Sequence, residues 1–149
     1  MQNTVYTGVI AGTLGGAAKL AVNLLFYLAG IAKITTVHSA AAALLPKGTA
    51  LGTPPSLATG LAVEWLVAVL LGIIAVYLLR LTGRDLLWLK GIVYGGLTWV
   101  FGYGYLATLL VPEPLLRPDL ATSAAMLAAH LAFGLTALFV AGRYQIEAV

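Results

Sequence analysis

The sequence predicts an all-α polytopic membrane protein: a four-transmembrane-helix bundle with a short interfacial helix between spans one and two. Four long apolar runs fill nearly all of the 149 residues, and a run of about 20 apolar residues matches the roughly 30 Å hydrocarbon core of a bilayer. Hydrophobic residues make up 61% of the chain and charged residues only 9%, whereas about a quarter of the residues of a soluble domain are charged. The mean hydropathy is +1.00. We therefore expect one transmembrane domain over residues 1–149.

The first apolar run covers residues 5–32 and lacks the basic start of a cleaved signal peptide, so we expect it in the mature protein. An alanine-rich stretch over residues 35–45 then predicts a short helix at the membrane interface. The Gly and Pro residues of the stretch 46–55 end that helix. The second span, residues 56–81, begins at Ser56, whose hydroxyl is suited to an N-cap.

The turn over residues 82–85 is short, which makes spans two and three antiparallel neighbours. The third span covers residues 86–111 and is followed by prolines, and a link of similar brevity leads to the fourth span over residues 119–141. Asp119 is a suitable N-cap for the fourth span because its carboxylate can accept from the free amides of the first turn.

The basic residues lie near the ends of the apolar runs, where long cationic side chains reach the headgroups. A nucleic-acid partner would require them on one face, so we expect the lipid bilayer as partner and no nucleic acid. Span ends place four on the side of both termini and three on the other: Arg80, Arg84, Lys90 and Arg143 against Lys33, Lys47 and Arg117. The positive-inside bias then predicts a multi-pass protein of the cytoplasmic (inner) membrane with both termini in the cytoplasm.

Small residues mark the faces where helices can approach each other. Lipid tails are as apolar as Leu, so close backbone contact must supply the association of the spans. Glycines repeat at fourth positions in the first and third spans, and the other spans contribute further glycines. Those expected to pack helices are Gly8, Gly12, Gly16, Gly72, Gly91, Gly95, Gly102 and Gly134. We expect them to pack helices within the chain. A homo-oligomer contact, or one with subunits of a membrane complex, is the alternative.

Five polar residues recur at similar depths inside the spans: Lys19, Asn23, Glu64, Thr98 and His130. An ionisable group at that depth is costly unless it finds a partner or water. Glu64 is the natural counter-ion of Lys19. Side chains lean toward the N-terminus of their own helix, which carries these two apart in antiparallel spans, so a water, Asn23 or His130 could be needed to bridge them.

This polar layer has two interpretations. It is either a hydrogen-bond network that fixes helix register or a site that relays protons or holds a charged substrate at mid-membrane. Haem ligation by His130 would need a second ligand from His38 or from another subunit, and the absence of a Soret band would exclude it. The chain has no cysteine, and no serine elbow or HExxH motif occurs. We therefore expect no enzymatic activity, no metal and no cofactor.

The pattern resembles small four-span bacterial membrane proteins of unknown function, of the YqhR/YagU-like kind. The residues that carry the resemblance are the segment 8–12 (GVIAG) with Lys19 and Asn23, the segment 90–95 (KGIVYG) with Trp99, and the segment 130–134 (HLAFG). The resemblance implies a bacterial cytoplasmic-membrane bundle and brings no activity or catalytic residues with it.

Two functions follow as expectations. The first is a non-enzymatic scaffold or accessory subunit that packs with itself or with a larger membrane complex, which the minimal loops favour. The alternative is a small transporter or channel-like unit that uses Lys19, Glu64 and His130 for ion or proton passage. Retained folding and oligomer size in Lys19→Met would favour the first, and loss of flux in liposomes the second.

Overall fold

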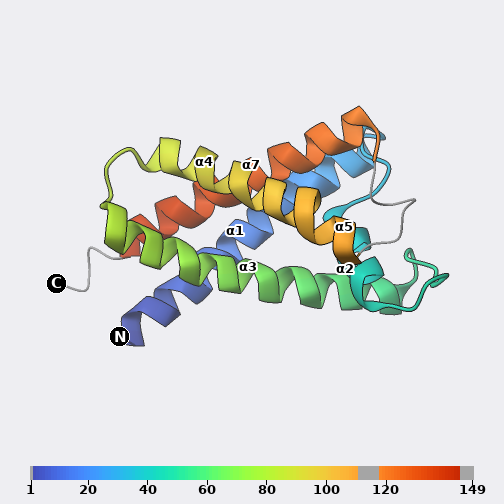
Figure 1. The fold of residues 1–149 in the computed structure, drawn as a ribbon, viewed down its shortest axis with the longest axis horizontal. Coiled ribbons are helices and arrows are strands. Elements are labelled where there is room, and N and C mark those ends of the chain that lie inside the picture. The colour runs from blue at the N-terminus through green and yellow to red at the C-terminus, as the bar shows by residue number, and fades with distance from the viewer. Residues whose placement is uncertain (1, 111–117, 145–149) are drawn as a thin grey trace.

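The computed structural model describes residues 2–110 and 118–144, and these ranges contain helices and turns but no strand. The elements in chain order are α1 (Gln2–Leu28), α2 (Thr36–Leu44), α3 (Pro54–Thr82), α4 (Leu87–Trp99), the π-helix η1 (Val100–Leu106), α5 (Ala107–Leu110) and α7 (Leu120–Tyr144). The all-α class is confirmed for the described residues. Figure 1 shows that α1 begins and α7 ends at the same end of the molecule as the turn between α3 and α4, whereas α2 lies at the opposite end.

Three helices are long and apolar enough to cross a membrane, in place of the four expected: Thr4–Leu28, Pro54–Thr82 and Leu120–Tyr144. The predicted third span, residues 86–111, is divided into α4, η1 and α5, and its last residue lies outside the described ranges. A π-helix bonds each amide to the fifth preceding carbonyl and so interrupts the α-helical ladder. Glycine is a poor helix former, and η1 contains Gly102 and Gly104.

Two predicted helix boundaries were wrong for local reasons. The first helix ends at Leu28 rather than near residue 32, because Gly30 adopts a φ of 72° that a helix cannot continue. The helix α3 begins at Pro54 rather than Ser56, since a proline in the first turn lacks only an amide that has no helical partner. Thr53 is the N-cap residue of α3, and the Ser56 hydroxyl donates to the Thr53 carbonyl at 2.9 Å.

Among the described residues, four helix pairs make the main contacts. The helix α1 lies against α3 and α7, α4 lies against α7, and α2 lies against α3. A Cβ at Gly12 would overlap the Ala68 carbonyl, and one at Gly72 would overlap the backbone of Gly8 and Gly12. Only glycine therefore fits where α1 crosses α3.

The second close crossing joins α4 to α7. A Cβ at Gly95 would overlap the His130 carbonyl, and one at Gly134 would overlap the Gly91 carbonyl. Gly102 was wrongly grouped with these residues, because a Cβ there would meet nothing within 4 Å. Gly60, which the sequence analysis did not single out, lies directly under the Val37 carbonyl of α2.

The connection between α1 and α2 is fixed to the start of α7. The Asp119 carboxylate accepts from the Thr122 amide at 2.8 Å, which confirms it as the N-cap. The Lys33 ammonium lies 2.6 Å from the same carboxylate, and the Lys33 amide donates to the Thr122 hydroxyl at 3.0 Å. These contacts join two segments that are far apart in the sequence.

Asp119 is expected to titrate well below an ordinary aspartate. Hydrogen bonds from Lys33 and Thr122 lower the pKa of Asp119 from 3.8 to about 2. A pKa lowered by folding means that the associated stabilisation is complete above about pH 4 and is lost as the pH falls toward 2. A carboxyl ¹³C NMR titration measures this pKa, which Lys33→Met should raise toward 3.8. Lys47→Met, in the α2–α3 connection, is the control, and an unchanged midpoint in Lys33→Met would contradict the assignment.

Candidate functional site

Lys19 of α1 and Glu64 of α3 form a direct ion pair between Nζ and Oε2. Their side chains are only 10% and 18% exposed. The close α1–α3 crossing at Gly16 and Ala68 explains the contact, since each charged residue lies about one helical turn from it. No bridging group is needed, so the opposed lean of the two side chains matters less than expected.

His130 of α7 is held in one tautomer. Its Nδ1 lies 2.7 Å from the Met126 carbonyl, which can only accept, so Nδ1 carries the proton. The Nε2 of the neutral ring is then a hydrogen-bond acceptor. The Tyr103 ring meets the imidazole edge-on, with centroids 6.4 Å apart, and the hydroxyls of Tyr103 and Ser39 share a hydrogen bond of 2.7 Å.

Asn23 has a different role from the other polar residues. It is fully buried, and its Oδ1 accepts from the Thr36 amide at 2.9 Å. That amide belongs to the first turn of α2 and has no helical partner of its own. Asn23 therefore caps α2 and ties it to α1. Thr98 donates to the Gly95 carbonyl of its own helix at 2.8 Å.

A pocket of about 540 Å³ lies between α3 and the α4–η1–α5 segment. Lys19, Glu64, Thr98 and His130 all line it, together with the hydroxyl residues Thr36, Ser39 and Tyr103. The remaining lining is mostly apolar and includes Val67, Ile74, Leu97 and Phe101. The structure thus brings four of the five predicted polar residues to one cavity, whereas Asn23 does not line it.

The pocket lies where α3 and α4 make few direct contacts. Figure 1 shows α4 apart from α3, with α1 passing between them in this view, and α5 next to α2 at the far end. Tyr94 bridges α3 and α4 where its hydroxyl donates to the Leu71 carbonyl at 2.6 Å. Beyond this bridge the pocket walls carry exposed side chains, and Phe101 is 63% exposed. The pocket therefore opens onto the apolar outer surface.

The charged floor of the pocket lies at one depth. Lys19 is nine residues before the end of α1, Glu64 is ten residues after the start of α3, and His130 is ten residues after the start of α7. At a rise of 1.5 Å per residue these positions are about 15 Å from the α2 end of the molecule. This distance equals about half of a hydrocarbon core, which is the depth expected for these groups from the sequence.

Haem ligation would need a second ligand beside His130, and His38 does not supply it. In residues 2–110 and 118–144, no three His, Asp or Glu side chains are grouped to hold a metal ion. His38 makes other contacts. Its Nδ1 accepts from the Thr35 amide at 3.2 Å, and the centroid of its ring lies 5.7 Å from that of Tyr27. Partial burial lowers the pKa of His38, which favours this accepting, neutral form. His38 does not line the pocket with His130.

No protein-family model, curated protein or solved structure matches this chain.

Proposed function

We propose that this chain is a non-enzymatic, four-span membrane protein that binds a lipid-soluble molecule in the pocket between α3 and η1. The α4–η1–α5 segment would be the crossing that the three long helices do not supply, third in chain order. Its three helical elements follow one another directly from Leu87 to Leu110. Its outward side chains are apolar and exposed, among them Val93, Leu97 and Phe101. At about 1.5 Å per residue this segment is long enough for the bilayer core.

The observation that carries this function is the contrast between the mouth and the floor of the pocket. The mouth is lined by exposed apolar side chains such as Val67, Ile74 and Phe101, which in a bilayer face acyl chains. The floor holds the Lys19–Glu64 pair. Ligand sites are concave, mostly apolar and carry a few polar groups that fix orientation. A ligand dissolved in the bilayer would enter such a pocket sideways.

This proposal is a specific form of the accessory-subunit hypothesis, since the protein acts by binding. Ion or proton transport is the second candidate, and the meeting of Lys19, Glu64 and His130 at one cavity favours it. Against it, the ion pair neutralises its own charge and the walls offer few groups to replace a hydration shell. Proton and ion flux in liposomes distinguishes the two: flux that Lys19→Met abolishes would support transport.

Filling the pocket is expected to abolish ligand binding. A Cβ at Gly102 meets nothing within 4 Å, so Gly102→Leu should extend into the cavity without displacing the backbone. Val67→Trp fills it from the opposite wall. With a tritiated, diazirine-bearing alkyl probe in liposomes, we expect saturable photolabelling of wild-type protein and at least a fivefold loss in both variants.

Each change has a matched control in the same segment of the chain. Gly96 also has open space around its Cβ and does not line the pocket, and Leu66 is an exposed neighbour of Val67. Gly96→Leu and Leu66→Trp should retain saturable labelling. Equal labelling of all five proteins, or labelling that never saturates in wild type, would refute the binding function.

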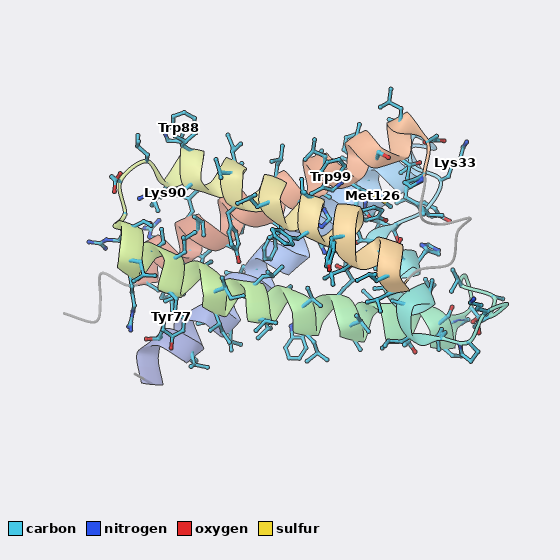
Figure 2. All side chains as sticks on the ribbon, in the orientation of Figure 1. Lys33, Tyr77, Trp88, Lys90, Trp99 and Met126 are labelled. Carbon is cyan, nitrogen blue, oxygen red and sulfur yellow. The ribbon has the colours of Figure 1, made fainter. Side chains whose placement is uncertain are left out.

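The membrane orientation is part of the same proposal, with both termini on the cytoplasmic side of a cytoplasmic membrane. Arg84 donates to the Gly142 carbonyl near the end of α7, and Figure 2 places Lys90 and Lys33 at opposite ends of the molecule. The end with both termini therefore carries Arg80, Arg84, Lys90 and Arg143, as the positive-inside rule requires of a cytoplasmic face.

Cysteine labelling is expected to show four crossings. The chain has no native cysteine, so single cysteines can be placed at Thr49, Arg84 and Leu120, each in or beside a connection. An impermeant maleimide in sealed vesicles should reach Thr49→Cys and Leu120→Cys from one side and Arg84→Cys from the other. Leu120→Cys on the side of Arg84→Cys would mean that the α4–η1–α5 segment does not cross.

A further inference from the structure

We infer that the ligand of this pocket is a neutral lipid whose head is a hydroxyl group, held between His130 Nε2 and the Lys19–Glu64 pair. This inference rests on the proposed binding function and specifies the chemistry of the ligand. It depends on three features of the pocket: its net charge, its uncommitted donors and acceptors, and the position of its apolar walls.

The charge of the floor is balanced before any ligand binds. Lys19 and Glu64 neutralise each other. His130 is 7% exposed, so a further positive charge on its ring would be costly there, and in the neutral ring the bond to Met126 keeps the single proton on Nδ1. An anionic or cationic head would therefore bring an uncompensated charge into an apolar site near mid-membrane, which is unfavourable. A sulfate, phosphate or quaternary ammonium head is excluded by this argument, and a neutral head is selected.

The polar groups of the floor offer both donors and acceptors. The Lys19 ammonium has three N–H groups and the ion pair uses one of them. His130 Nε2 offers a lone pair, because Nδ1 holds the proton. Thr36 is 3% exposed and lines the pocket, and its hydroxyl has no hydrogen-bond partner among the residues described.

A hydroxyl is the smallest neutral group that satisfies such a floor. It can donate to His130 Nε2 and at the same time accept from Lys19 or Thr36. An ether or an ester carbonyl only accepts, so it would leave Nε2 unmet in a buried site, where an unsatisfied polar group is costly. The class includes long-chain alcohols, isoprenoid alcohols and glycerides with a free hydroxyl, which share this head.

The walls place the tail of such a molecule. Leu97 and Phe101 on one side and Val67 and Ile74 on the other lead from the floor to the outer surface. A cavity of about 540 Å³ is within the usual range for a small-molecule site. It holds the head and the first part of a chain, and the rest of the chain extends into the surrounding lipid.

A competition experiment in liposomes tests the head group. The probe is a diazirine-bearing hexadecanol, and the competitors are hexadecanol, hexadecyl methyl ether and hexadecyl sulfate, which share one tail. We expect hexadecanol to compete at least tenfold better than the ether and the sulfate. In His130→Phe the alcohol and the ether should compete equally, whereas His38→Phe should keep the wild-type preference.

Each outcome identifies which proposal fails. If the ether competes as well as the alcohol in wild type while Gly102→Leu still abolishes labelling, the binding function stands and the hydroxyl inference is wrong. A preference for the sulfate would overturn it as well. If His130→Phe does not fold, Thr36→Val, which keeps the backbone bond to Asn23, should reduce the preference severalfold, and an unchanged preference would count against the inference.

Discussion

Glu64→Gln is expected to destabilise the protein by about 3–5 kcal/mol, because it leaves the Lys19 ammonium charged and unpaired at a largely buried position. Lys19→Met should cost a similar amount, since the Glu64 carboxylate then loses its counter-ion. The measurement is reversible unfolding in mixed micelles, or the unfolding midpoint in lipid where unfolding is irreversible.

The double variant Lys19→Met/Glu64→Gln separates pairing from independent roles. It buries no unpaired charge, so it should be far more stable than the two single changes predict together. Lys33→Met is the matched control, because the Lys33 side chain is 78% exposed in its pair with Asp119. An exposed pair of that kind contributes little to stability. Additive single effects would show that Lys19 and Glu64 do not act as a pair.

Gly95→Leu is expected to separate α4 from α7 and to destabilise the protein by at least about 1–3 kcal/mol, the usual range for overpacking. A Cβ at this position would overlap the His130 carbonyl, and the next nearest atom is Leu131 Cα. Backbone atoms cannot move aside as a flexible side chain can. The unfolding free energy, or the melting midpoint in lipid, measures the effect.

The adjacent glycine gives the control for this change. A Cβ at Gly96 meets nothing within 4 Å, so Gly96→Leu adds the same side chain to the same helix at nearly the same depth. We expect Gly96→Leu to leave stability nearly unchanged or to raise it slightly, because glycine is the poorer helix former. Equal losses in both variants would mean that α4 does not pack on α7 through this face.

Much of the helical architecture was predictable because membrane helices carry simple patterns. The lengths of the apolar runs indicated which segments are helical, and α2 forms within the alanine-rich stretch expected to form a helix. The meeting of Lys19 and Glu64 could be anticipated because a lone charge at mid-membrane requires a counter-charge at the same depth. The depth of a residue within a span can be estimated by counting residues from the end of the apolar run.

The remaining features depend on which way each helix faces, which one sequence does not reveal. Asn23 was grouped with Lys19 because the two share a helix face, yet its acceptor is fixed by the distant start of α2. Gly102 follows the spacing of packing glycines but faces open space. The π-helix that divides the third span has no recognised residue pattern. Tyr103 and Ser39 meet only because α2 and η1 converge.

The central claim is that the buried charges converge on one pocket floor, and a dipolar-coupling measurement tests it most directly. With ¹⁵Nζ-lysine and ¹³Cδ-glutamate labels, solid-state NMR of the protein in bilayers reports lysine–glutamate pairs. The other two ion pairs in residues 2–110 and 118–144 involve aspartate and stay silent. We predict strong ¹⁵N–¹³C dephasing that Glu64→Gln removes. Absence of dephasing in the wild-type protein, or its persistence in Glu64→Gln, would contradict the account.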